Sequence, residues 1–371
     1  MLSKSEKISR LRLFRTESIG SSKFWELVEA YGSAENTLKK LPKILNLKDT
    51  KKVTDICSDE KIEEEIAHMK SLGARFVFFE DELYPPLLRT IPDPPPVLSF
   101  LGNKERVLSF YQKNMISVVG ARNASIYSSK FCNTLCRNLG TNNVVIVSGL
   151  ARGIDASAHA GSLQTGTIAV MANGINIVYP QENAKLYNEI IKENGIFSET
   201  PFNVAPQPQL FPRRNRIIAG MSYGTAVIEA AEESGSLITA RMALEYNRDV
   251  FDVPGSPLDP RSVGCNRLIK EGATLLQDAR DILDQLETKK IIPYQLFDDN
   301  HPSVIKISTK DMGKIRKKIL DSLSSIPITI DELISSIKVS PQEVLTVLLE
   351  LELANKIVRL HGQRVCLALD S

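Results

Sequence analysis

Short, continuous runs of apolar residues alternate with helical segments between Met115 and Val253. The first two runs, Ile116 to Val119 and Val144 to Val147, each end in a turn, and Ser125 can cap the helix that follows the first of them. Continuous apolar strands that alternate with helices predict a parallel sheet covered on both faces. The other runs that predict strands are Ile168 to Met171, Ile196 to Phe197, Ala226 to Ile228 and Val250 to Val253.

The part of the chain before this pattern predicts a small helical module. Apolar residues recur at helical spacing in two stretches that each end at a glycine, so we assign residues 1–75 to this module. Two further strands are predicted at Arg75 to Phe79 and at Val97 to Leu101. The core that bears the sheet therefore covers residues 76–287.

The last part of the chain predicts a third module. Residues 288–310 have the polar, proline-containing composition of a linker, and residues 311–371 predict three helices and a hairpin, which together make a winged helix–turn–helix. The predicted recognition helix, Pro341 to Asn355, carries glutamates but no Lys or Arg, so DNA phosphates would be repelled there. We interpret the module as a protein contact or a spacer. The alternative is that DNA touches its basic first helix, which carries Lys314, Arg316, Lys317 and Lys318.

Composition narrows the class of protein. The 371 residues suffice for two or three domains, and 43% hydrophobic and 24% charged residues are ordinary for a soluble globular protein. A net charge of +2 means that any affinity for nucleic acid must come from a local patch. Five scattered cysteines and four histidines argue against a zinc site and favour reduced thiols. We expect a cytoplasmic protein with no metal, no membrane span and no signal peptide.

The stretch from Phe211 to Ser236 carries the strongest chemical signal. Its arginines suit phosphates, because one guanidinium group can donate two parallel hydrogen bonds to phosphate oxygens. Its phenyl ring suits the face of a nucleobase. A Ser-Gly-Ser turn at a predicted helix start would aim backbone N–H groups at an anion. A purely structural or interface cluster of arginines is the alternative. The residues concerned are Phe211, Arg213, Arg214, Asn215, Arg216, Gly235 and Ser236.

Several other candidate residues fall where predicted strands end. Ligands of parallel sheets sit beyond the carboxyl ends of the strands, and these ends hold Arg122, the pair Ser148-Gly149 and the pair Asn173-Gly174. The turn at Gly120 has one glycine where a dinucleotide fingerprint needs three, and the chain has no P-loop motif. We therefore expect no nicotinamide, flavin or other cofactor.

Two pairs of titratable residues could in principle act in catalysis. Asp155 and His159 share a helix face at a spacing of four, but no nucleophile lies at a matching strand end, so we interpret the pair as structural. Glu199 and Glu229 both end strands, and paired carboxylates could hydrolyse a glycosidic bond.

Six motifs in one order resemble the DNA-processing protein A family (DprA, also called Smf). They are VVGARNAS, SGLARGIDASAH, TIAVMANGINIVYP, FPRRNRIIAG, EAAEESGSLITA and VFDVPGSP. The resemblance covers Tyr84 to Ile282 closely and the flanking modules loosely, the first of them as a SAM or helix-hairpin-helix-like module. One motif departs from the family pattern, with Ala172 where relatives usually have Gly and Asn176 where they usually have Asp.

The resemblance implies a Rossmann-like, doubly wound, mostly parallel α/β core that binds single-stranded DNA and forms a homodimer. It further implies that the protein helps to load the RecA recombinase during natural transformation and DNA recombination, without catalysis of its own. Family DNA contacts would map onto Arg122, Phe211, Arg214 and Asn215. We expect Arg122 and Arg214 to clamp phosphates, Phe211 to stack a base, and the amides of Ser148-Gly149 and Gly235-Ser236 to help. The next candidates are Arg152, Arg213 and Arg216.

The alternative function is a phosphoribohydrolase of the lysine-decarboxylase-like family. Those enzymes cleave nucleoside monophosphates and carry a PGGxGTxxE motif, to which Ser234 to Thr239 is the equivalent stretch here. Thr239 stands where the catalytic Glu would be, and a threonine cannot act as a general acid or base at neutral pH. The sequence therefore favours a pocket that binds phosphate without chemistry.

Overall fold

The computed structural model describes residues 2–45, 56–287, 312–337, 339–354, 356–360 and 362–368. These residues belong to two compact units. The larger unit is Glu63–Asp298, and the smaller unit joins Met1–Ile62 with Asp299–Ser371. The predicted linker, residues 288–310, lies outside the described residues. Among the residues described, none of the helices has the length and apolarity needed to cross a bilayer.

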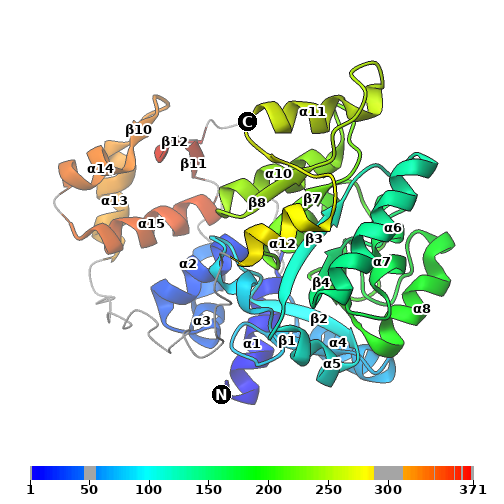
Figure 1. Cartoon of the computed structure of the whole chain (residues 1–371). Coiled ribbons are helices and arrows are strands. Elements are labelled where there is room, and N and C mark those ends of the chain that lie inside the picture. The colour runs from blue at the N-terminus through cyan, green and yellow to red at the C-terminus, as the bar shows by residue number, and fades with distance from the viewer. Residues whose placement is uncertain are drawn as a thin grey trace. The chain divides into compact units, whose positions relative to one another are not determined.

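A nine-stranded sheet organises the larger unit (Figure 1), with the strand order β1-β2-β6-β5-β4-β3-β7-β8-β9. Strands β3 to β9 are all parallel, whereas β2 runs antiparallel to β6 and to β1. The predicted doubly wound, mostly parallel sheet is therefore confirmed. The strands are β1 (Arg75–Phe78), β2 (Val97–Gly102), β3 (Asn114–Val119), β4 (Val144–Ser148), β5 (Thr167–Met171), β6 (Gly195–Ser198), β7 (Gly224–Val227), β8 (Asp249–Asp252) and β9 (Thr274–Leu275).

Helices cover both faces of this sheet (Figure 1) because each central strand is apolar on both sides. On β3, Met115 and Val119 join one buried cluster, while Ile116 and Val118 join the other. The helical elements of this part of the chain are α4 (Asp59–Ser71), η1 (Pro86–Thr90), α5 (Lys104–Phe110), α6 (Ile126–Thr141), α7 (Ile154–Ser162), η2 (Gln181–Asn183), α8 (Ala184–Glu193), α9 (Leu210–Gly220), α10 (Gly235–Glu245), η3 (Pro260–Ser262), α11 (Val263–Lys270) and α12 (Ala279–Glu287).

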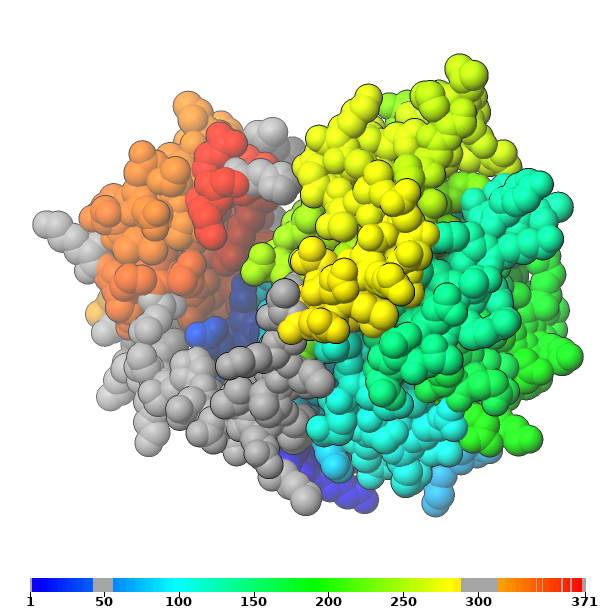
Figure 2. Space-filling view, viewed as in Figure 1, coloured from blue at the N-terminus to red at the C-terminus, as the bar shows by residue number. Residues whose placement is uncertain are grey.

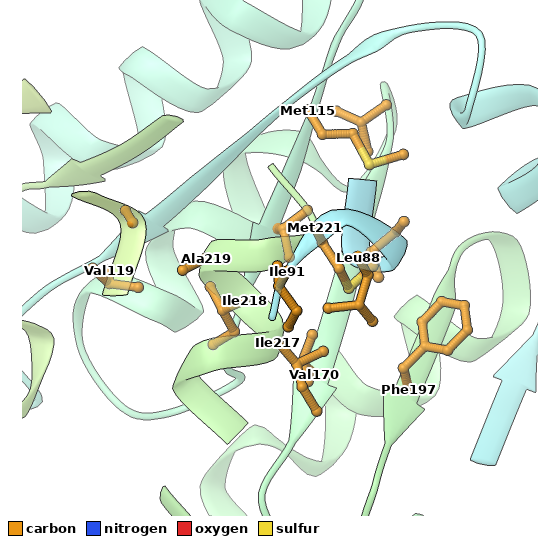
Figure 3. Packing of buried hydrophobic residues seen from close by; sticks show 14 of the residues in the cluster. Leu88, Ile91, Met115, Val119, Val170, Phe197, Ile217, Ile218, Ala219 and Met221 are labelled. Atoms are coloured by element: carbon orange, nitrogen blue, oxygen red, sulfur yellow. The ribbon is translucent and has the colours of Figure 1, made fainter. Parts of the chain in front are cut away.

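The two faces are packed by different helices. Side chains of α5, α9, α10 and α11 fill one face, where Ile217 and Ile218 of α9 lie near Val170 of β5 (Figure 3). Side chains of α6, α7 and α12 fill the other, and in the space-filling view α6 and α12 form adjoining parts of the surface (Figure 2). Because α9 packs along the sheet through these isoleucines, its first turn is held at the edge where the parallel strands end.

The smaller unit holds the first three helices of the predicted helical module and the predicted winged helix, and both modules are confirmed, but most of α4 falls in the larger unit. Its described strands form a three-stranded sheet in the order β10-β12-β11. Two helices of this unit begin with a capping box: the backbone N–H of Glu332 donates to Oγ1 of Thr329, and that of Glu343 donates to Oγ of Ser340. The elements are α1 (Lys4–Arg15), α2 (Ser21–Tyr31), α3 (Ala34–Leu45), α13 (Met312–Ser322), β10 (Ile328–Thr329), α14 (Ile330–Ile337), α15 (Pro341–Leu353), β11 (Ile357–Leu360) and β12 (Arg364–Leu367).

The acidic helix α15 makes contacts with α2 inside this smaller unit. The carboxylate of Glu350 is buried and accepts hydrogen bonds from the hydroxyl of Tyr31 and the guanidinium of Arg316. Glu352 lies 3.1 Å from the ammonium group of Lys23. Within the smaller unit, the glutamates that would repel DNA are thus used in contacts with another element of the same chain.

Candidate nucleic-acid interface

A pocket of about 270 Å³ lies at the carboxyl edge of the sheet in the larger unit. It is built by the loops that follow β3, β4 and β5 and by the first turns of α9, because parallel strands bring their carboxyl ends to one edge. The predicted location of the site at strand ends thus corresponds to a real pocket. Its lining residues are Arg122, Asn123, Gly149, Ala151, Arg152, Met171, Ala172, Asn173, Tyr179, Pro180, Phe211 and Arg214.

The structure divides the predicted site residues into two groups. Arg122, Gly149, Arg152, Phe211 and Arg214 come together in the pocket lining. The other six, all within the described residues, lie outside that lining: Ser148, Arg213, Asn215, Arg216, Gly235 and Ser236. The DNA contacts of both groups stay predictions.

Arg122 is an exposed cation of the pocket. It follows β3, and its guanidinium carbon lies 4.5 Å from the centre of the Phe211 ring, which comes from the first turn of α9. A cation over the face of an aromatic ring is attracted by the negative charge of that face. Phe211 therefore holds the Arg122 charge at the pocket while leaving the side chain accessible.

Arg214 has a different environment, because its side chain is only 6% exposed. Its Nη1 donates to the backbone carbonyl of Gly149, which directly follows β4, and to that of Val170, which lies on the neighbouring strand β5. Burial lowers the pKa of Arg214 to about 10, so the guanidinium remains charged at neutral pH. Arg214 therefore joins the ends of β4 and β5 beneath the pocket and adds a positive charge from below.

The carboxylate of Asp155 accepts hydrogen bonds from backbone N–H groups that follow β4. Its Oδ2 accepts from the N–H of Gly149 at 3.2 Å and from the N–H of Ala151 at 3.3 Å. Burial raises the pKa of Asp155, and the nearby charge of Arg214 opposes that rise. The sequence suggested the backbone N–H of Gly149 as a donor to a bound anion. In the structure this N–H already donates to the side chain of Asp155.

His159 completes this internal network. Its Nε2 accepts from the N–H of Leu150 at 3.3 Å, and its Nδ1 lies 2.7 Å from Oγ1 of Thr167. Burial lowers the pKa of His159 to about 3, so the imidazole is neutral at physiological pH. These contacts support the interpretation of Asp155 and His159 as a structural pair that shapes the loop after β4.

Arg216 lies on another side of α9, since two residues along a helix turn the side chain by about 200°. Its guanidinium forms an ion pair with Glu199 and lies 3.5 Å from the carboxylate of Asp93. Arg216 is 7% exposed and Glu199 is also 7% exposed. This arginine therefore neutralises the buried carboxylate of Glu199 and the half-buried carboxylate of Asp93 within the fold.

Glu199 and Glu229 are too far apart to act as a pair. They follow β6 and β7, which are separated by four strand spacings in the sheet, on the order of 19 Å. The two carboxyl groups of a glycosidase are about 5–10 Å apart. Glu229 instead accepts from the N–H of Ser125 at 3.1 Å and from the hydroxyl of Ser128 at 2.7 Å, at the start of α6.

Of the remaining predicted residues, Arg152 belongs to the pocket lining and the others lie outside it. Arg213 is exposed, and Arg152 is exposed and lies 2.8 Å from a carboxylate oxygen of Glu182. Asn215 donates from Nδ2 to the carbonyl of Gly235 at 3.3 Å. Ser148 and Ser236 are both buried; the hydroxyl of the first donates to the carbonyl of Val118, and that of the second lies 2.7 Å from the Ser234 hydroxyl.

The sequence reasoning missed one exposed aromatic residue of the pocket. Tyr179 is 43% exposed, and its ring centre lies 6.2 Å from that of Phe211, with the two planes tilted by 53°. The residue is the fourth of the motif segment NIVYP, where an aromatic side chain precedes a proline in the loop that follows β5. That position was the signal from which it could have been found.

Comparison with known protein families gives three matches along the chain. The model of DNA recombination-mediator protein A matches residues 75–287. The model of the DprA-like N-terminal HHH domain matches residues 4–67, and the model of the DprA winged helix domain matches residues 308–363.

Individual relatives agree with these matches. The chain is 36% identical to protein Smf of Escherichia coli strain K12 over 306 residues, which is 82% of this chain and 80% of that protein. It is 40% identical to DNA processing protein DprA of Bacillus subtilis strain 168 over 233 residues, which is 62% of this chain and 77% of that protein.

Two solved structures are also similar. The X-ray structure of DNA processing protein A from Streptococcus pneumoniae superimposes with a TM-score of 0.63 and 31% identity, over 77% of this chain and 99% of that one. DNA processing protein A from Helicobacter pylori, whose structure was described for its mode of binding single-stranded DNA, gives a TM-score of 0.52 and 28% identity. That match covers 58% of this chain and 96% of the other.

Proposed function

Since the chain belongs to the DNA recombination-mediator protein A family, we propose that it binds single-stranded DNA at the pocket beyond β3, β4 and β5. The binding is independent of sequence, because the groups at the pocket suit backbone phosphates and base faces rather than base edges. The protein acts in DNA processing, as the names of its relatives indicate for them. The family resemblance implies that this role belongs to transformation and recombination.

One observation carries the DNA-binding proposal: an exposed guanidinium is mounted on an aromatic ring at the pocket. Arg122 offers a charged fork to a phosphate, and Phe211 beneath it limits the orientations of that fork. Arg214 also lines the pocket, where the nearby carboxylate of Asp155 offsets part of its positive charge. The similar Helicobacter pylori protein, described for its binding of single-stranded DNA, supports the same ligand here.

The finer parts of the proposal concern partners and location. The protein assists the loading of the RecA recombinase on single-stranded DNA, works as a homodimer and acts in the cytoplasm, as the family resemblance implies. Two pockets in a dimer would raise the affinity for one strand if the strand can reach both.

The proposal is binding without catalysis. The separation of Glu199 from Glu229 and the presence of Thr239 in place of a catalytic glutamate both disfavour phosphoribohydrolase chemistry. We therefore keep release of base from nucleoside monophosphates only as the second arm of the test.

The test compares Arg122→Ala with Arg137→Ala in fluorescence anisotropy with labelled oligonucleotides of poly-dT and of poly-dA across a salt series. Arg137 is an exposed arginine of α6 that lies outside the pocket lining, which makes it a matched control. We expect Arg122→Ala to bind about tenfold more weakly for every base composition, and to lower the slope of log K against log salt by about 0.7.

Two results would contradict the proposal. Equal binding by the two variants would remove Arg122 from the interface, and an altered sequence preference would exclude a phosphate contact. If the wild-type protein binds no oligonucleotide at low salt, the DNA proposal fails, and release of base from nucleoside monophosphates would then test the alternative enzyme.

A further inference from the structure

We propose that Tyr179 supplies the ring on which a nucleobase stacks, and that Phe211 acts as a positioning residue for Arg122. The inference rests on the proposed binding of single-stranded DNA and assigns separate roles to the two rings of the pocket. It differs from the expectation drawn from the sequence, in which Phe211 stacks the base.

The surroundings of Phe211 argue against a free ring face for a base. The Arg122 guanidinium lies 4.5 Å from its ring centre, and the Arg214 guanidinium carbon lies 5.9 Å from it. The Tyr179 ring centre is 6.2 Å away. A base that stacked on the face beneath Arg122 would have to displace the cation that is needed for the phosphate.

The surroundings of Tyr179 favour it as the stacking residue. It lines the same pocket, and 43% of the residue is exposed, so its ring can receive a flat partner. The 53° tilt between the two rings means that Tyr179 is not itself stacked on Phe211. Every base offers an aromatic face, so stacking on this ring requires no particular sequence.

The segment that carries Tyr179 is attached to the body of the pocket. Pro180 is buried and also lines the pocket. Asn183 then donates from Nδ2 to the carbonyls of Leu150 and Ala151 at 2.9 and 3.1 Å, which ties the segment to the loop after β4. The tyrosine ring is therefore presented from a fixed backbone, which lowers the cost of ordering it on binding.

The size of the pocket agrees with this division of roles. A volume of about 270 Å³ lies just below the range of about 300–1,000 Å³ that is usual for ligand pockets, which suits no more than one nucleotide at a time. The phosphate of this nucleotide would contact Arg122, and its base would contact Tyr179. Phe211 lies near both side chains, since its ring contacts the Arg122 guanidinium and the Tyr179 ring.

The test uses two labelled oligonucleotides of equal length, one of poly-dT and one that carries abasic sites throughout. The abasic oligonucleotide keeps every phosphate but has no base to stack. We expect Tyr179→Ala to bind poly-dT about tenfold more weakly than the wild type and to show a much smaller loss on the abasic oligonucleotide. Tyr179→Phe keeps the ring and is expected to restore binding of poly-dT.

Phe211→Leu is expected to behave differently from Tyr179→Ala. It should weaken binding of both oligonucleotides and lower the salt slope as Arg122→Ala does, since both changes affect the phosphate contact. The double variant of Phe211 and Arg122 should bind no more weakly than Arg122→Ala alone, because the two residues act as one unit.

Several outcomes would overturn the inference. One is a Tyr179→Ala variant that binds poly-dT like the wild type, or that loses equal affinity for both oligonucleotides. Another is a Phe211→Leu variant that loses affinity for poly-dT alone, because that result would return the stacking role to Phe211. A wild-type protein that binds neither oligonucleotide would overturn both the proposed function and this inference. The variant results above would overturn the inference alone, so the two kinds of failure can be told apart.

Discussion

At the scale of single residues, the pocket is shaped by polar side chains that make their hydrogen bonds to the backbone of the protein itself. Asp155 and His159 hold the amides after β4, and Arg214 holds the carbonyls of Gly149 and Val170. Few groups are therefore left to rearrange when a ligand arrives. The exposed Arg122 is the contrast, because its charge is directed outward.

Gly149 is required by the close approach of Arg214. A Cβ atom at this position would lie 2.1 Å from Nη1 of Arg214, whereas one at Gly20, which is not a candidate site residue, would meet no atom within 4 Å. We expect Gly149→Ala to displace the guanidinium, to lower the free energy of unfolding by about 1–3 kcal/mol and to weaken DNA binding. Urea unfolding and anisotropy measure the two effects, with Gly20→Ala as the matched control. Equal behaviour of the two variants would contradict the account of Arg214.

Asp252 is a buried carboxyl group whose ionisation opposes folding. Burial raises its pKa to about 7, and the neighbouring thiol of Cys265 opposes that rise only in part. Because the folded state holds the proton more tightly than the unfolded state, this group stabilises the fold below about pH 4. That contribution is lost as the pH rises from about 4 to about 7.

Asp252→Asn removes this dependence on pH. We expect the variant to be more stable than the wild type at pH 8, by up to about 4 kcal/mol, and the difference to disappear near pH 4. Urea unfolding of both proteins between pH 4 and pH 8 measures it. A difference that stays constant over this range would show that Asp252 does not titrate there.

At the scale of elements, the contact between α2 and α15 stabilises the smaller unit. Glu350 is 5% exposed and balances Arg316 while it accepts from Tyr31. Removing one member of a buried ion pair leaves the other without compensation. The acidic recognition helix is therefore a structural part of the unit.

We expect Glu350→Ala to destabilise the smaller unit by about 3 kcal/mol. The exposed Glu29 of α2 is the control, and Glu29→Ala should change stability by no more than about 0.5 kcal/mol. Hydrogen exchange of the amides in α2 and α15 of the full chain reports the loss locally. Unchanged protection of both helices in Glu350→Ala would show that the contact does not stabilise them.

The sequence predicted most elements because continuous apolar runs mark buried strands and capping residues mark helix starts. It could not predict that β2 runs antiparallel beside β6, since a strand buried on both faces shows the same pattern in either direction. Two-residue β9 has too few positions to show any pattern. The site was predicted only in part because the phase of α9 decides which arginine faces the pocket, and this phase places Arg214 there and Arg216 against Glu199.

At the scale of the whole molecule, 46 basic and 44 acidic residues nearly cancel. The field around the protein is therefore weak, and attraction of DNA must come from the pocket and the exposed arginines of its surroundings. The exposed arginines among the predicted site residues are Arg122, Arg152 and Arg213.

This charge distribution predicts a modest dependence of DNA binding on salt. Three phosphate contacts at a slope of about 0.7 each give a slope of about −2 for log K against log salt. Anisotropy titrations with poly-dT between 50 and 300 mM salt, on the order of physiological ionic strength, measure the slope. A slope near −5 would show that a wider basic surface takes part.

The central place of β3 also bears on how the sheet is completed while the chain is being synthesised. Strands β4, β5 and β6 follow β3 directly and extend the sheet on one side, but β7, its neighbour on the other side, begins about 100 residues later. At typical rates of translation this delay is on the order of 10 s. During that time the nascent chain carries an apolar strand with an unpaired edge, which is a template for pairing with other chains. We expect chaperones at the ribosome exit to matter most for this protein between the synthesis of β3 and that of β7.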